Sequence, residues 1–205
     1  MSGNRKQRLR RRMDTFMDDR GWRMVPGPER VESCVLDHCE LAYPAVRCVT
    51  DLACPADELM RFLVDHVTET LPRWSRDIVA CEELERLAAD ERILLVRTRS
   101  PVPFVAARED LFYVHRGQDE DGAFFEVSEL CEHPTPVTPG AVRSHMHFAS
   151  KHIHPRAEGC RYEVVWQYDP MGWLSRLLPR SVGVAAVHDH MKDECRRLRE
   201  HFGGR

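Results

Sequence analysis

Hydrophobic and polar residues follow each other along this chain in a pattern that predicts a β-rich fold with a helix near each end. A helical start is predicted over residues 5–20, before the helix breaker Gly21, and apolar residues recur with helical period over residues 181–201. A shorter helix is predicted over residues 56–66, directly after Pro55. Between these helices the pattern takes the period of a strand. It predicts eight strands, over residues 33–37, 45–52, 78–87, 93–98, 110–116, 124–131, 142–152 and 161–168.

The connections between the predicted strands indicate how the strands pair. Short polar turns, such as residues 117–122 and 155–159, join consecutive strands, which is typical of an antiparallel sheet. The last helix carries a continuous apolar stripe made of Val184, Val187, Met191, Cys195, Leu198 and Phe202. One face of the sheet is therefore expected to be covered by this helix, and a curved sheet that grips a helix leaves a space between the two. The expected fold class is α+β.

Composition and hydropathy narrow the class of protein. The 205-residue chain is 42% hydrophobic and 31% charged, which is typical of a globular protein with one substantial core. Its longest apolar run, residues 182–187, is too short to span a bilayer. The N-terminus is basic but has no apolar stretch behind it, so a secretory signal is not predicted. We therefore expect a cytoplasmic protein.

Charge is distributed unevenly along the chain. The formal net charge is −3, yet the first twelve residues contain basic side chains and no acidic ones. The rest of the chain is accordingly acidic, which argues against a nucleic-acid-binding domain. We expect a basic N-terminal helical segment over residues 1–28 and a ligand-binding domain over residues 29–205. The basic segment could attract anionic lipid or RNA, or it could be a solvated helix start.

Cysteine and histidine patterns predict neither metal binding nor catalysis. The eight cysteines include no CxxC pair and are interpreted as reduced core residues. His145 and His147 share a strand face, as do His152 and His154, and this spacing is compatible with zinc. A third ligand would have to be His115 or Glu126, so hydrogen-bonded histidines are favoured. No nucleophilic triad or paired-carboxylate spacing stands out, and we expect no catalytic residue, metal or cofactor.

Several landmarks follow one another along the chain: Trp74, the turn 101–103, the strand 108–114, Pro134 with the strand start 140–143, and the exit 169–174 into the last helix. In order and spacing they resemble those of the START (steroidogenic acute regulatory protein-related lipid transfer) domain of the helix-grip, Bet v 1-like superfamily. Glu109 interrupts the Arg-Asp pair of that strand, which departs from the family pattern. The resemblance implies a curved antiparallel sheet around the C-terminal helix, with an internal hydrophobic cavity for one lipid.

If Tyr113 points into that cavity, alternation along the strands predicts the other residues that line it. The C-terminal helix adds residues from its buried stripe. The predicted lipid-binding residues are Val96, Thr98, Leu111, Tyr113, His115, Phe125, Val127, His145, His147, Val164, Trp166, Tyr168, Val184, Val187, His188 and Met191. A different interpretation is that these side chains only fill the core. Either His145 or His147 is a candidate for binding a ligand hydroxyl or carboxylate.

Two segments are candidates for contact with a membrane. One is the basic N-terminus and the other is an apolar stretch flanked by arginines just before the last helix. The predicted contact residues are Arg5, Lys6, Arg8, Arg10, Trp173, Leu174 and Leu177. We expect a monomer that associates with membranes peripherally and transiently.

Three functions are consistent with the sequence. The first is a carrier that buries one lipid, such as a sterol, a fatty acid or a phospholipid, and transfers it between membranes, with the C-terminal helix and adjacent loops as a lid. The second is an enzyme similar to the polyketide aromatase/cyclases of the same superfamily. The third is a lipid-responsive interaction module in which the basic N-terminus docks a protein.

Overall fold

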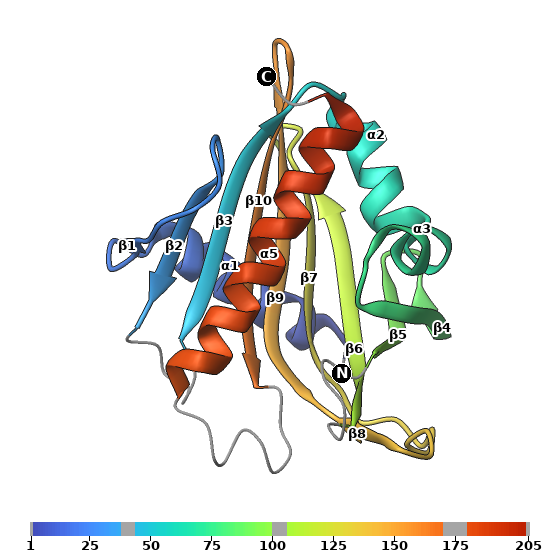
Figure 1. The fold of residues 1–205 in the computed structure, drawn as a ribbon. Coiled ribbons are helices and arrows are strands. Elements are labelled where there is room, and N and C mark those ends of the chain that lie inside the picture. The colour runs from blue at the N-terminus through green and yellow to red at the C-terminus, as the bar shows by residue number, and fades with distance from the viewer. Residues whose placement is uncertain (1, 38–43, 100–105, 170–179, 204–205) are drawn as a thin grey trace.

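A ten-stranded sheet forms the centre of the molecule, and helices lie on both of its faces (Figure 1). The computed structural model describes residues 2–37, 44–99, 106–169 and 180–203. The strand order is β1-β2-β3-β10-β9-β7-β6-β5-β4, with antiparallel neighbours, and β8 pairs in parallel with β6. The strands are β1 (Arg23–Met24), β2 (Glu32–Leu36), β3 (Ala45–Leu52), β4 (Ile78–Ala88), β5 (Glu91–Thr98), β6 (Ala107–Gln118), β7 (Phe124–Leu130), β8 (Ala141–Arg143), β9 (His145–Arg156) and β10 (Gly159–Asp169).

The helices are α1 (Ser2–Asp18), α2 (Ala56–Met60), the π-helical turn η1 (Arg61–Asp65), α3 (Val67–Trp74) and α5 (Arg180–Phe202). The α+β class, the antiparallel sheet and the long C-terminal helix are confirmed. All eight predicted strands are present. The sequence missed β1, which has two residues and is too short to show an alternation. The predicted strand 142–152 is divided at Ser144 into β8 and β9. The predicted helix 56–66 continues through a π-helical turn to Trp74.

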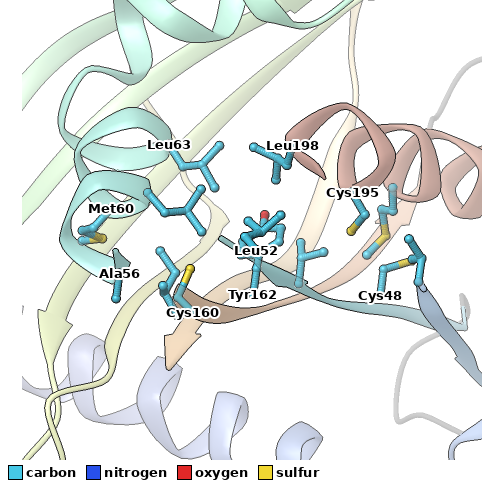
Figure 2. Close-up of a cluster of buried hydrophobic side chains, with 14 of the residues drawn as sticks. Cys48, Leu52, Ala56, Met60, Leu63, Cys160, Tyr162, Cys195 and Leu198 are labelled. Atoms are coloured by element: carbon cyan, nitrogen blue, oxygen red, sulfur yellow. The ribbon is translucent and has the colours of Figure 1, made fainter. Parts of the chain in front are cut away.

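The helix α5 packs on one face of the sheet, which we call the α5 face. Met191, Cys195 and Leu198 are fully buried there against β3 and β10. Figure 2 shows Cys195 and Leu198 beside Cys48, Leu52 and Tyr162 of these strands, with Met60 and Leu63 closing the cluster from the side of α2 and η1. The Tyr162 hydroxyl donates a hydrogen bond of 2.7 Å to Glu194 Oε1, which fixes the middle of α5 to β10.

The helix α1 packs on the opposite face, which we call the α1 face, and lies behind the sheet in Figure 1. Its apolar side chains Leu9, Met13 and Phe16 are buried against residues of β6, β7, β9 and β10. The ring of Phe16 stacks on Phe148 with a centroid distance of 5.0 Å. This helix therefore completes a second hydrophobic cluster on the sheet.

The basic residues of α1 pair with carboxylates of the strands and turns. Arg5 and Arg8 both contact Glu129, Lys6 Nζ lies 2.7 Å from Glu91 Oε1, and Arg10 Nη2 lies 2.8 Å from Asp119 Oδ2. The hydrogen bond from Lys6 lowers the pKa of Asp90. The positive charges of Arg5, Lys6, Arg8 and Arg10 are thus balanced by carboxylates of the strands and turns.

Seven cysteines lie among the described residues, and all of them are free thiols. Six are buried, in agreement with their interpretation as core residues, and Cys131 is half-buried. In the part of the chain that the structure describes, no helix has the length and apolar composition needed to span a membrane.

If α1 is part of the packed structure, truncating its buried side chains must weaken the fold. We expect Met13→Ala to lower the free energy of unfolding by about 2–5 kcal/mol, because it leaves a cavity in a fully buried site. The matched control is Arg11→Ala on the exposed side of the same helix, with an expected change below about 0.5 kcal/mol. Urea denaturation of both variants measures the difference. Equal stabilities would contradict the packing role of α1.

Candidate functional site

Two separate hydrophobic clusters occupy the α5 face. The larger one joins α5 and α2 to β3 and β10, and it contains Val164 and Met191. The second joins α3 to β4, β5 and β6, and it contains Val67 and Val96. At one end of the middle strands, Phe124 of β7 and Ile153 of β9 take part in the larger cluster. Farther along, these two strands lie between the clusters.

The middle strands contribute small side chains to this interval. Ser128 of β7 pairs with Val114 of β6 on one side and with Ala149 of β9 on the other, and Ala149 pairs with Trp166 of β10. Residues paired in register share a face of the sheet, so these side chains all point toward α5. The strip defined by Ser128 and Ala149 carries little side-chain volume, and we call it the central strip.

Large apolar side chains border the central strip and are only half-buried, although they lie on an inward face. They are Phe112, Trp166 and Tyr168 of the sheet and Val184 and Val187 of α5. Such side chains keep apolar surface that a hydrophobic ligand can cover. Small residues at the floor and aromatic residues at the rim make this part of the α5 face the candidate site.

The strand residues predicted to line one cavity lie on two different faces. Val96, Thr98, Val164, Trp166 and Tyr168 are on the α5 face, according to the strand register and the clusters. The prediction that a second group shares this face is wrong. This group consists of Leu111, Tyr113, His115, Phe125 and Val127.

The orientation of Tyr113 is the source of this error. Its ring packs in the cluster of α1, its hydroxyl contacts Glu91, and the guanidinium of Arg5 lies 4.1 Å from the ring centroid. Val114, one residue later, belongs to the cluster under α3. Both faces of β6 are covered, so apolar residues occur at both parities and alternation cannot tell which face binds a ligand.

The remaining predicted residues have different environments. On α5, Val184 and Val187 are half-buried, whereas His188 and Met191 are buried. His147 occupies the extra position where the pairing of β9 with β10 shifts, and its carbonyl oxygen accepts a hydrogen bond from Arg12. The side chain of His145 and the residues Trp173, Leu174 and Leu177 lie outside the described residues. Lipid contact by any of these residues stays a prediction.

Asp110 is a polar group on the α5 face that sequence reasoning did not select. It pairs with Val96 in the strand register, and its carboxylate accepts a 2.5 Å hydrogen bond from Ser144 Oγ. Burial, partly offset by this hydrogen bond, raises the pKa of Asp110 to about 6. A carboxyl that stays partly protonated near neutral pH can donate as well as accept a hydrogen bond.

A charged cluster lies farther along the same face. Lys151 Nζ is 2.7 Å from Glu126 Oε1, and Arg92 Nη2 is 3.4 Å from Glu126 Oε2. The same Arg92 nitrogen donates a 2.6 Å hydrogen bond to the carbonyl oxygen of Val64 in the π-helical turn. Glu126 interrupts an apolar run, which is a weak signal for this cluster in the sequence, but its partners come from other strands.

A recess of about 10 Å³ lies at the turn between β4 and β5, lined by residues that include Ala89 and Arg116. This volume accommodates about one water molecule. It is too small for a lipid, although Val114, the strand partner of Ser128, also lines it. The internal tunnel expected from the sequence therefore stays a prediction.

The model of the START domain family matches residues 16–202 of the chain. Among solved structures, human StAR-related lipid transfer protein 5 has a TM-score of 0.89 at 17% identity, covering 99% of this chain and 97% of its own. The STAR-related lipid transfer protein (fragment 25–204) from Xanthomonas axonopodis has a TM-score of 0.74 at 21% identity, covering 89% and 98%. The Zhui aromatase/cyclase from Streptomyces sp. R1128 has a TM-score of 0.51 at 12% identity, covering 78% and 93%. No curated protein matches the sequence.

Asp110 predicts a specific pH dependence of stability. Its pKa in the folded protein is above the unfolded value, so the folded state holds a proton that the unfolded chain has lost between about pH 4 and pH 6. Stability is therefore lost as the pH rises through this window, by about 3 kcal/mol in total. We expect the stability of Asp110→Asn relative to wild type to increase as the pH is raised from 4.5 to 7.5, because only the wild type loses stability over this range. Urea denaturation at both pH values measures this, and a pH-independent difference would contradict the buried, protonated carboxyl.

Proposed function

Because the chain belongs to the START domain family, we propose that it binds one hydrophobic lipid between α5 and the central strip of the sheet and carries it between membranes. The observation that carries this proposal is the division of the core on the α5 face. Two clusters leave an interval with Ala149 and Ser128 at its floor and half-buried Phe112 and Trp166 at its rim.

The binding energy in this proposal comes from burial of apolar surface. Each Å² of apolar area removed from water contributes about 25 cal/mol, so a lipid chain is held without covalent chemistry. The second half of α5 is fixed by Tyr162 and by the buried cluster around Cys195. Exchange of the lipid would then begin at the first half of α5, where Val184 and Val187 are less buried. This half of the helix and the adjacent loops would act as the lid.

The proposed contact with a membrane involves the apolar segment before α5, with Trp173, Leu174 and Leu177. An apolar stretch flanked by arginines suits a membrane interface. Arg5, Lys6, Arg8 and Arg10 are weaker candidates, because each is engaged by a carboxylate of the sheet. The proposal accordingly includes a cytoplasmic location with peripheral and transient contact to membranes.

Asp110 favours a second candidate, a cyclase-like enzyme of the same fold. A buried carboxyl with a pKa of about 6 can act as an acid or a base at neutral pH. The fold is shared with an aromatase/cyclase, but fold alone does not determine activity. In that case Asp110→Asn would abolish turnover of a bound aromatic or polyketide substrate while leaving binding intact.

Native mass spectrometry of the purified protein, followed by organic extraction, tests the proposed function. A stoichiometric lipid adduct, and transfer of that lipid between two populations of vesicles, are the expected results. A protein free of adduct, with no thermal shift across sterols, fatty acids and phospholipids, would rule out the carrier.

Filling the central strip tests where the lipid lies. We expect Ala149→Phe to reduce the lipid stoichiometry several-fold with little loss of stability, because the ring enters space that the ligand would occupy. The matched control, Ala186→Phe, makes the same change on the solvent side of α5 and should leave binding unchanged. Lipid content by mass spectrometry and a thermal melt measure both effects. A loss of stability of about 1–3 kcal/mol, as in an overpacked core, would contradict an open strip.

A further inference from the structure

His188 has an unpartnered nitrogen in a buried position of α5. The residue is 8% exposed and lies one helical turn from Val184 and from Met191, which both pack in the cluster on the α5 face. Its Nε2 has no hydrogen-bond partner among the residues that the structure describes. Buried polar atoms are nearly always paired in folded proteins, so an unpaired one indicates a missing partner.

The imidazole of His188 is held in its neutral form. Burial lowers the pKa of His188, and the positive charge of Lys192 lowers it further, while Asp189 acts in the opposite direction. Both charged groups belong to α5 itself, and they pair with each other at 2.8 Å. A neutral imidazole has one nitrogen that donates a hydrogen bond and one that accepts.

We infer that His188 recognises the polar end of the ligand through a hydrogen bond at Nε2, and that this polar end is an uncharged hydroxyl group. The inference rests on the proposed function, because it requires a ligand beneath α5. A hydroxyl group both donates and accepts, so it satisfies Nε2 in either tautomer. The ligand class is therefore a largely apolar lipid with a single hydroxyl head.

The surroundings disfavour an anionic head at this position. A carboxylate or a phosphate buried beside His188 needs a cation, and the nearby ammonium of Lys192 is already engaged by Asp189. The neighbours Val184 and Met191 on the same helix face are apolar. They suit a hydrocarbon body that ends in one neutral polar group.

Paired lipids with and without a hydroxyl group test the inference. Affinities are measured for cholesterol and cholest-5-ene, for oleyl alcohol and 1-octadecene, and for oleate. We expect the wild type to prefer the hydroxyl-bearing member of a pair by about tenfold. His188→Phe should bind both members equally, and His188→Asn, which keeps a donor and an acceptor, should restore part of the preference. The control His201→Phe, on the exposed end of α5, should keep the full preference.

Each outcome bears on a different statement. If the wild type binds these lipids and His188→Phe keeps the same preference, the role of His188 is overturned while the carrier stands. If the wild type prefers oleate and His188→Phe loses that preference, the hydroxyl class is overturned. If the wild type binds none of the probes and carries no lipid in native mass spectrometry, the proposed function fails together with the inference.

Discussion

The central strands of the sheet are covered on both faces, and this double coverage determines how the molecule uses each face. On one face, Leu9, Met13 and Phe16 of α1 pack into the sheet, and basic residues of the same helix pair with Glu129 and Asp119. Apolar contacts and ion pairs together hold α1 against the sheet. The other face, under α5, carries the divided core, and it is the face to which we assign the ligand.

The division of the core follows from which side chains the middle strands supply. Tyr162 and its neighbours fill the space under the second half of α5, and Val67 fills the space under α3. Ser128 and Ala149 fill little between them. A well-packed protein interior leaves few voids, and the lipid of our proposal would fill the interval above this strip of small residues.

Polar groups on the α5 face are few, and their placement favours binding over chemistry. Lys151 and Arg92 both pair with Glu126, although Arg92 Nε has no hydrogen-bond partner among the described residues, and Asp110 accepts a hydrogen bond from Ser144. The Nε2 atom of His188 is the described polar atom on α5 that is buried without a partner. An unsatisfied hydrogen-bonding atom beside apolar side chains can select a ligand by its head group, whereas acid–base catalysis needs several titratable groups positioned around a reacting atom.

The sequence by itself determined the elements of this fold, because the period of the apolar residues is a local property. It predicted the strands from 33–37 to 161–168, the last helix and the family. It could not determine which face Tyr113 and Phe125 occupy, because both faces of their strands are buried and the alternation gives no direction. It also could not predict that Arg5 reaches Glu129 or that His188 lacks a partner. These depend on contacts between residues far apart in the chain, and only the tertiary structure decides them.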